Sequence, residues 1–190
     1  MNSKRHQYAK ALIKKGLKIF AVKGGTKKPV NEGWQAEAGR GGLKQWENGA
    51  DHNIGIATGD GIVAVDPDMG KGVDGEANWA ALCKEHGIIE SPFQTKTPNG
   101  GRHILYKHDP ALDIRNSASK IAKGVDVRGK GGYVVAPGSE IPEGHYVPIN
   151  KGAEIMDAPQ ALLDLIVRKK GVKVARKGLS GEDLDKKDNL

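Results

Sequence analysis

A single stretch sets the architecture of this chain: Gly61-Ile62-Val63-Ala64-Val65-Asp66-Pro67-Asp68. Four consecutive apolar residues, rich in β-branched side chains and preceded by glycine, predict a buried strand. Because side chains alternate along a strand, we expect Asp66 and Asp68 to leave its end on the same face. Two carboxylates held this close repel each other unless a cation lies between them. Oxygen ligands of this kind suit Mg²⁺ or Mn²⁺, so the pair predicts a metal site.

The composition is that of a globular chain without disulfides. Of its 190 residues, 37% are hydrophobic and 28% charged, which is enough for one sizeable domain. The single cysteine, Cys83, excludes a disulfide framework and cysteine-rich zinc sites. No stretch of the sequence is long and apolar enough to be read as a membrane span or a signal peptide. These features together predict a reducing, intracellular and therefore cytoplasmic location.

The formal net charge of +7 favours an anionic partner. The charge is uneven, because residues 168–190 hold eight Lys or Arg against four Asp or Glu. The preceding part is only mildly basic, so a grip on nucleic acid would depend on local patches. We expect one domain over residues 1–170 and a charged linker or tail over residues 171–190.

Hydrophobic periodicity and glycine positions predict a mixed α and β chain. Helices are expected over about residues 5–15, 75–85 and 160–170. Strands are expected at residues 17–22, 53–57, 62–66 and 102–106, twice within 124–139, and at 145–149. Gly59-Asp60-Gly61 joins two apolar runs and predicts a hairpin that pairs 53–57 with 62–66. Residues 109–123 are expected to form a polar connection.

A basic loop follows the first predicted strand: Lys23-Gly24-Gly25-Thr26-Lys27-Lys28-Pro29. Such a loop could hold phosphate through its lysines and backbone N–H groups. A solvated loop with chance lysines explains the segment equally well.

Two common ion-binding and phosphate-binding motifs fail. A calcium loop that starts at Asp66 needs glycine at its sixth position and glutamate at its twelfth, where this chain has Lys71 and Ala77. The segment from Gly124 to Lys130 resembles a phosphate-binding P-loop. However, Gly131 stands where Ser or Thr must bind Mg²⁺.

Three carboxylates follow short apolar segments: Asp66, Asp68 and Asp126. His103 lies on another predicted strand that is entered through a glycine turn, with Arg102 beside it. Such carboxylates could hold two divalent ions about 4 Å apart, as enzymes of in-line phosphoryl displacement do. Arg102 and His103 would then bind a triphosphate and the charge that develops on it. Each residue alone more often caps a turn or satisfies backbone groups.

The order of these motifs resembles the archaeo-eukaryotic primase superfamily, in particular the prim-pol domains of phage and plasmid replication proteins. The resemblance covers about residues 8–150 and depends on three segments, 53–59, 97–103 and 124–139. It implies a mixed α/β (α+β) fold. In that fold an N-terminal α/β part packs against an RRM-like module, with the active site in the cleft between them.

The resemblance also implies roles for particular residues. The first family motif falls on Asp66 and Asp68 and the third on Asp126, as ligands of two Mg²⁺ or Mn²⁺ ions. The second falls on Gly101-Arg102-His103, whose arginine and histidine would contact the phosphates of the incoming nucleotide. Gly101 stands where a serine is common, so a hydroxyl contact found in some relatives is lost. Less directly, the resemblance places four further residues around the nucleotide or template: Lys28, Asn53, Arg128 and Ser139.

The implied reaction is template-directed nucleotidyl transfer on single-stranded DNA. A primer 3′-hydroxyl, or that of an initiating nucleotide, attacks the α-phosphate of an NTP or dNTP, and pyrophosphate leaves. The protein would thus be a DNA primase and DNA polymerase of phage or plasmid replication, acting in the host cytoplasm without zinc. A helicase or helical primase module would follow the charged tail, as is usual in the family.

Two rival functions remain open. A metal-dependent nuclease or phosphodiesterase could use the same carboxylates with water as nucleophile, but it leaves Arg102 and His103 unexplained. A non-catalytic module that binds nucleotide or single-stranded DNA predicts binding that survives loss of Asp66 and Asp68. The low share of aromatic residues, 5%, counts mildly against a dedicated surface for base stacking.

Overall fold

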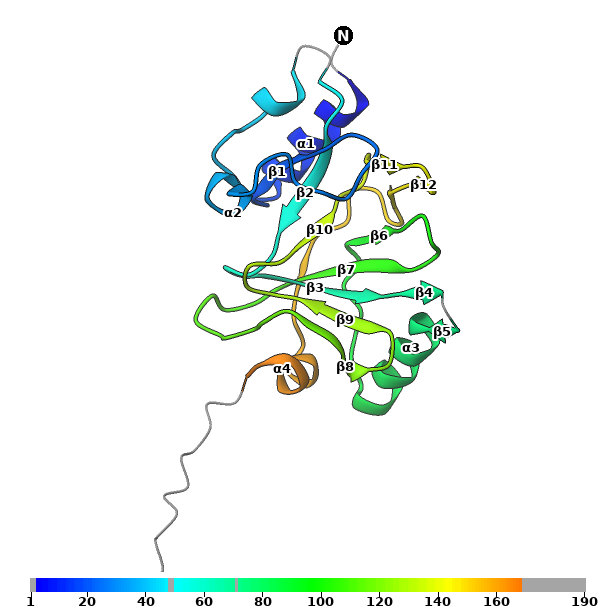
Figure 1. Ribbon diagram of the computed structural model, residues 1–190. Helices are drawn as coiled ribbons and strands as arrows, with labels where there is room; N and C mark the ends of the chain where they lie inside the picture. Colours follow the sequence, from blue (N-terminus) through cyan, green and yellow to red (C-terminus); the bar gives the residue numbers. More distant parts are fainter. Residues whose placement is uncertain (1–2, 48–49, 71, 169–190) are drawn as a thin grey trace, which may run out of the picture.

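Two β-sheets make up most of the computed structural model, which describes residues 3–47, 50–70 and 72–168. The small sheet, in the upper half of Figure 1, has the order β1-β2-β10. The large sheet below it has seven strands in the order β13-β6-β7-β3-β9-β8, with β14 alongside β7. Every pairing in the two sheets is antiparallel except that of β14 with β7. The predicted mixed α and β class is therefore confirmed.

The strands are short. Those of the small sheet are β1 (Ile19–Val22), β2 (Asn53–Ala57) and β10 (Tyr133–Val135). Those of the large sheet are β3 (Ile62–Pro67), β6 (Gln94–Lys96), β7 (Arg102–Lys107), β8 (Ser117–Ala122), β9 (Val125–Arg128), β13 (Val147–Pro148) and β14 (Met156–Asp157). Two small hairpins are formed by β4 (Met69–Gly70) with β5 (Val73–Asp74) and by β11 (Glu140–Ile141) with β12 (Gly144–His145).

The sequence marks the ends of some helices more clearly than those of others. They are α1 (Lys4–Lys14), α2 (Trp34–Glu37), α3 (Gly75–His86), α4 (Gln160–Ile166) and a 3₁₀ turn, η1 (Lys44–Trp46). Asp74 caps α3 by accepting a hydrogen bond from the Ala77 amide, and Gly87 ends it with a φ of 65°. Among the described helices, none has the length and apolar character needed to cross a bilayer.

The inner face of the large sheet carries both the apolar core and the predicted site. Along β3, Val63 and Val65 face a cluster formed with α3 and α4, whereas Ala64 faces the small sheet and α1. Asp66 shares the face of Ala64, because it lies two residues further along the strand. The two sheets therefore pack through apolar residues at one end of β3, and this packing gives way to carboxylates at the other end.

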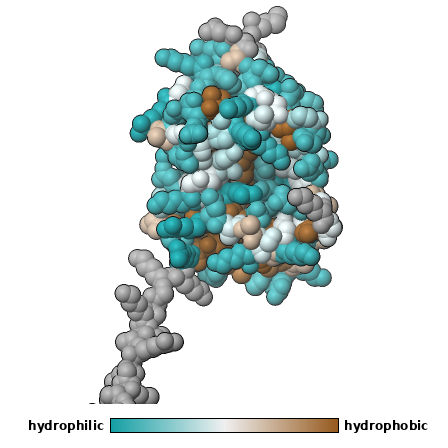
Figure 2. Space-filling model, viewed as in Figure 1, coloured by the Kyte–Doolittle hydropathy of each residue, from teal (hydrophilic) through white to brown (hydrophobic). Residues whose placement is uncertain are grey.

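The outer surface fits this arrangement of buried apolar faces. Figure 2 shows that the side of the molecule seen in Figure 1 is mainly hydrophilic, with hydrophobic residues in separate patches. The aromatic rings of Phe20, Trp34 and Tyr133 cover the outer face of the small sheet, where Phe20 stacks on Trp34 with ring centroids 4.3 Å apart.

The predicted hairpin between residues 53–57 and 62–66 is wrong. The turn exists, since Gly59, Asp60 and Gly61 have φ values of 84°, 51° and 93° and Gly59 pairs with Ile62. However, β2 pairs with β1 and β10, whereas β3 pairs with β7 and β9. The turn therefore passes the chain from one sheet to the other, and each strand finds its partners far away in the sequence.

Other boundaries also differ from the predictions. The last helix ends at Ile166 rather than near residue 170, because Val167 turns to pair with Ile114. Residues 145–149 form parts of two short strands, β12 and β13. The predicted polar connection contains β8, an edge strand of the large sheet, whose sequence lacks the apolar alternation that predicts a strand. The predicted tail, residues 171–190, lies outside the described residues.

Replacing Gly55 by alanine should test the packing of the small sheet. A Cβ at this position would overlap the ring of Phe20, which is buried and stacked on Trp34. We expect a loss of about 1–3 kcal/mol in the free energy of unfolding, measured by urea denaturation. Gly33→Ala is the matched control, since a Cβ there meets nothing within 4 Å. Equal stability of the two variants would contradict this account.

Candidate active site

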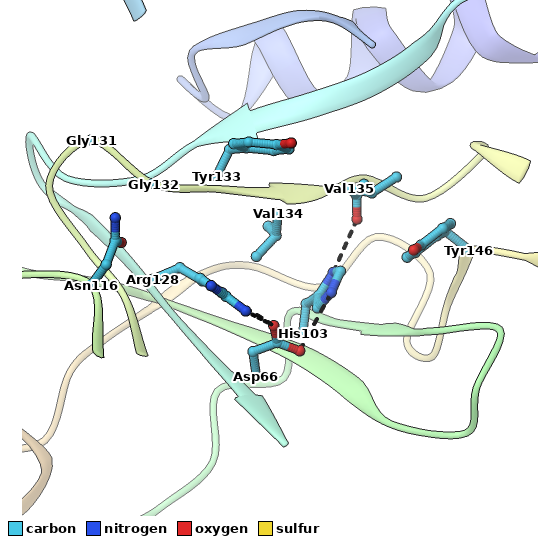
Figure 3. A pocket seen from close by; sticks show the side chains of 10 residues that line it. All are labelled: Asp66, His103, Asn116, Arg128, Gly131, Gly132, Tyr133, Val134, Val135 and Tyr146. Atoms are coloured by element: carbon cyan, nitrogen blue, oxygen red, sulfur yellow. Dashed lines mark hydrogen bonds and ion pairs between the residues drawn. The ribbon is translucent and has the colours of Figure 1, made fainter. Parts of the chain in front are cut away.

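A cavity of about 320 Å³ lies between the two sheets, at the polar end of their interface. Its walls come from β3, β7 and β9 on one side and from β10 with the preceding glycine loop on the other (Figure 3). The lining residues are Asp66, His103, Asn116, Arg128, Gly131, Gly132, Tyr133, Val134, Val135 and Tyr146. The cavity is therefore mainly polar, and its floor is the inner face of the large sheet.

Strand register explains why the charged side chains meet. Asp66 on β3 lies directly opposite Asp126 on β9. Arg128 follows Asp126 by two residues and so shares its face, while His103 comes from β7 on the other side of β3. Three neighbouring strands thus contribute one cluster, although its members span more than sixty positions of the sequence.

Asp66 and Asp126 are both buried, at 7% and 9% exposure, and Arg128 joins them. The Nη2 group of Arg128 donates to Asp126 Oδ2 at 2.9 Å and to Asp66 Oδ2 at 3.2 Å. Its Nε also donates to Asp66 Oδ2, at 3.3 Å. The cation that neighbouring carboxylates require is thus supplied by the chain itself.

The other oxygen of Asp126 is held by a strained piece of backbone. The amide of Ser119 donates to Asp126 Oδ1 at 3.0 Å. Ser119 adopts a φ of 51°, which is uncommon for a residue other than glycine, at the irregularity in the pairing of β8 with β9. Its Oγ accepts from the Gly124 amide at 3.0 Å. The bulge of β8 therefore fixes the orientation of the Asp126 carboxylate.

Asp68 lies just beyond β3 and is exposed, with its backbone fixed on both sides. Its amide donates to the Gly124 carbonyl at 2.8 Å, and its carbonyl accepts from the Gly75 amide at 2.9 Å. Partial desolvation, together with the charges of Asp66 and Asp126, raises the pKa of the Asp68 carboxyl. The three carboxylates therefore affect one another electrostatically, as the sequence predicts.

His103 is buried and held in one tautomer. Its Nδ1 lies 3.0 Å from the carbonyl oxygen of Val135, which can only accept, so Nδ1 carries the proton. Its Nε2 faces Asp66 Oδ1 at 3.6 Å. Burial lowers the pKa of this histidine, against the opposing effect of Asp66. Tyr146 stacks on the imidazole, with ring centroids 5.7 Å apart.

The prediction that Arg102 lies with His103 in the nucleotide site is wrong in its geometry. Consecutive residues of β7 point to opposite faces, so Arg102 lies on the side of α3. There its guanidinium donates to Glu76, Glu90 and Gln94 at 2.6–3.0 Å. Although burial raises the pKa of Glu90, hydrogen bonds from Arg102 hold it below its usual range.

Asn53 and Ser139 lie near the cavity but outside its lining, and both bond to backbone. Asn53 donates to the carbonyls of Thr26 and Glu140 and accepts from the Glu140 amide. Ser139 Oγ accepts from the Ile54 amide at 2.9 Å. Both side chains are buried and join β2 to the loops around the site, while their contact with a nucleotide stays a prediction.

The basic loop after β1 approaches the site through a different lysine from the one predicted. The hydroxyl of Tyr133 donates to the carbonyl of Lys27 at 2.7 Å, which anchors the loop to β10. Burial is the largest cause of the pKa shifts of Asp68 and His103, and the charge of Lys27 also acts on both. Lys28 bonds through its backbone to Thr26 and Lys23 and does not line the cavity.

Two lining residues have no counterpart in the sequence predictions. Asn116 Oδ1 accepts from the Gly129 amide at 2.9 Å, and this leaves its NH₂ group as a further donor. A Cβ on Gly132 would overlap Asn116, so the glycine loop is shaped to admit it. Tyr146 forms the wall between this cavity and a second one lined by Ser139. The one sequence signal for Asn116 as a site residue is that it lies in the polar segment before β9.

The donor set fits a hard divalent cation in its chemistry, because Asp66, Asp68 and Asp126 offer only oxygens. Burial is the largest cause of the raised pKa of Asp68, and the charges of Asp66 and Asp126 add to it. In the described part of the chain, however, no three His, Cys, Asp or Glu side chains are gathered closely enough to hold an ion as they stand. The guanidinium of Arg128 lies between Asp66 and Asp126, where a shared ion would have to bind.

Comparison with protein families gives this site its context. A family model described as bifunctional DNA primase/polymerase, N-terminal, matches residues 9–161, which is most of the chain. The chain belongs to this family. A search of curated proteins finds no significant match. The resemblance inferred from the motifs is thus confirmed, and the chain has the role of a DNA primase/polymerase domain in the broad sense that the family description gives.

Gly101 marks a local departure within this prim-pol domain. The common serine of the family motif is replaced by glycine, and the structure gives a reason. A Cβ at Gly101 would overlap the carbonyl oxygen of Pro67, which lies between Asp66 and Asp68. Because the obstacle is backbone, the chain carrying the carboxylates would have to move.

Restoring the family serine should therefore harm this prim-pol domain. We expect Gly101→Ser to lose about 1–3 kcal/mol of unfolding free energy in chemical denaturation. Gly33→Ser, at a position with open space, should stay within about 0.5 kcal/mol of the wild type. A Gly101→Ser variant as stable as this control would show that the end of β3 adapts without strain.

The separation of Arg102 from His103 can be tested by a pair of variants. Arg102→Met should lose about 2–4 kcal/mol of stability, because Glu76 and Glu90 are left without their partner, while its nucleotide affinity changes less than about twofold. Because hydrogen bonds from Arg102 hold the pKa of Glu90 below its usual range, the loss should shrink as the pH falls and Glu90 becomes protonated. His103→Ala should show the reverse: a small change in stability and at least about a tenfold loss of primer extension. Thermal melting and nucleotide titration measure both properties.

Proposed function

We propose that this prim-pol domain performs template-directed nucleotidyl transfer, as a primase, a DNA polymerase or both, in phage or plasmid replication. The observation that carries the proposal is the meeting of Asp66, Asp126 and His103 on three neighbouring strands: Asp66 and His103 line the cavity, and Asp126 lies opposite Asp66. A primer 3′-hydroxyl would attack the α-phosphate of an NTP or dNTP, forming the new P–O bond as the bond to pyrophosphate breaks.

Asp66, Asp68 and Asp126 are the residues that would hold two Mg²⁺ or Mn²⁺ ions. Bound divalent ions would supply Lewis acidity, which lowers the pKa of the attacking hydroxyl and neutralises the leaving pyrophosphate. The chain contributes orientation: the Ser119 amide fixes Asp126, and the pairing of β3 with β9 fixes Asp66 opposite it.

Cationic and donor groups around the cavity suit the triphosphate. Val135 holds the His103 ring with Nε2 toward the cavity, where Nε2 accepts in the neutral ring and would donate to a phosphate once the ring is protonated. The basic loop brings Lys27 to the same side. The NH₂ group of Asn116 and the guanidinium of Arg128 add donors beside the glycine loop. Preorganised donors of this kind stabilise charge that develops on phosphoryl oxygens.

We further propose that the two sheets are the two parts of the fold that the family resemblance implies. We assign the large sheet to the RRM-like module and the small sheet with α1 to the N-terminal α/β part. The lining of the cavity supports this, since residues of β3, β7 and β9 face residues of β10 across it. Single-stranded template and primer would lie at the open side, with salt-sensitive contacts to exposed lysines such as Lys23 and Lys27.

The proposal is tested by primer extension and de novo synthesis on single-stranded DNA, with Mg²⁺ or Mn²⁺ and with NTPs or dNTPs. We expect activity in the wild type and a loss of at least about a hundredfold in Asp66→Asn and Asp126→Asn, since each removes a charged ligand. Asp164→Asn, a change at an exposed carboxylate on α4, should retain full activity.

The alternatives give different results in the same assay. Degradation of the template that depends on Asp66 would support a metal-dependent nuclease in place of the polymerase. Nucleotide binding without synthesis or degradation, and unchanged in Asp66→Asn, would support a binding module. Either result would overturn the proposed reaction.

A further inference from the structure

Arg128 lies between two carboxylates that the proposed function assigns to the metal, those of Asp66 and Asp126. Figure 3 shows its contact with Asp66. A single nitrogen, Nη2, bridges Asp66 Oδ2 at 3.2 Å and Asp126 Oδ2 at 2.9 Å. The side chain comes from β9 itself, two residues after Asp126, so its position follows from the strand and not from a mobile loop.

The remaining oxygens of these carboxylates are directed to other groups. Asp126 Oδ1 accepts from the Ser119 amide at 3.0 Å, and Asp66 Oδ1 lies 3.6 Å from His103 Nε2. A cation shared by Asp66 and Asp126 would therefore need the oxygens that Arg128 now binds. Because two cations cannot occupy the same gap, Arg128 and a shared divalent ion exclude each other.

Arg128 has the freedom to leave the gap. Its side chain is 35% exposed, whereas those of Asp66 and Asp126 are 10% and 12% exposed. It lines the cavity beside Asn116 and Gly131, in the space that the proposed function gives to the nucleotide. A guanidinium that turned toward this space would exchange its carboxylate partners for phosphate, which it binds in the same forked geometry.

We propose that Arg128 is a displaceable cation that neutralises Asp66 and Asp126 until metal and nucleotide bind together. The inference rests on the proposed function, because it takes these aspartates as metal ligands. Without nucleotide, the guanidinium competes with the metal. With nucleotide present, the phosphates provide a new partner for Arg128, so nucleotide and metal favour each other's binding.

The test is the affinity of the purified protein for Mn²⁺, followed by the electron paramagnetic resonance signal of the free ion. Without nucleotide, Arg128→Met should bind Mn²⁺ at least about tenfold more tightly than the wild type. A non-hydrolysable nucleoside triphosphate should tighten Mn²⁺ binding in the wild type by a factor at least about fivefold larger than in Arg128→Met, since the variant has no competing guanidinium to displace.

Two variants make the titration specific. Arg115→Met removes another arginine that pairs with an aspartate, Asp113, away from the cavity, and it should bind Mn²⁺ like the wild type. Adding Asp66→Asn to Arg128→Met should abolish the gain, which shows that the tighter ion lies at these carboxylates. Thermal melting verifies that each variant is folded. Arg128→Lys, which keeps the charge but loses the forked geometry, replaces Arg128→Met if the latter does not fold, and it should bind Mn²⁺ about two- to threefold more tightly than the wild type.

The inference is overturned if Arg128→Met, or Arg128→Lys in its place, binds Mn²⁺ no more tightly than the wild type without nucleotide. It is overturned equally if the gain survives Asp66→Asn. Failure of the proposed function would be seen differently, as absence of primer extension in the wild type, because the Mn²⁺ titration requires no synthesis.

Discussion

The site is built around the repulsion between two buried carboxylates on adjacent strands. Asp66 and Asp126 are opposite each other in the register of β3 and β9, so the sheet itself brings their charges together. Such a pair is stable only with hydrogen bonds and a positive charge at hand. Arg128 provides the charge, and Ser119 provides a backbone donor at the cost of an uncommon φ value. The strain is thus located where the charge has to be controlled.

The rest of the fold makes that arrangement rigid. The inner face of the large sheet begins with Ala64 and Leu105, which pack against the small sheet, and ends with the polar cluster. The opposite face packs against Trp79 of α3 and Leu162 of α4. Because both faces of β3 are covered, the carboxylates cannot relax apart by bending the strand. The backbone of the large sheet is therefore a fixed support, and movement in the site is left to its long side chains.

The sequence predicted what depends on local pattern and failed where distant partners decide. Periodicity placed α1, α3, β2, β3 and β7. The motifs also named Asp66, Asp126 and His103, which meet on neighbouring strands and of which Asp66 and His103 line the cavity. The hairpin of β2 with β3 failed because its turn is correct while its pairing depends on β10 and β9. The local sequence of residues 109–123 did not predict the strand β8 or the place of Asn116 in the cavity wall, because both depend on contacts with Gly129 and β9. The roles of Asn53 and Ser139 around the nucleotide stay predictions, because residues of these types also serve, when buried, to bond to backbone, as both do here.

Two arginines show how the same chemistry serves different ends in this domain. Arg102 and Arg128 each pair with two carboxylates, and a sequence reading alone put both near the nucleotide. Arg102 bonds to three side chains, two of them the carboxylates of Glu76 and Glu90, which lie outside the cavity lining, so its network is expected to stabilise the fold. Arg128 bonds only to Asp66 and Asp126, and its own side chain is more exposed than that of Arg102, at 35% against 21%. Whether an ion pair stabilises the fold or regulates the site therefore depends on what else its carboxylates can bind. By this criterion the alternation of side chains along β7 makes Arg102 structural, and the register of β9 makes Arg128 exchangeable.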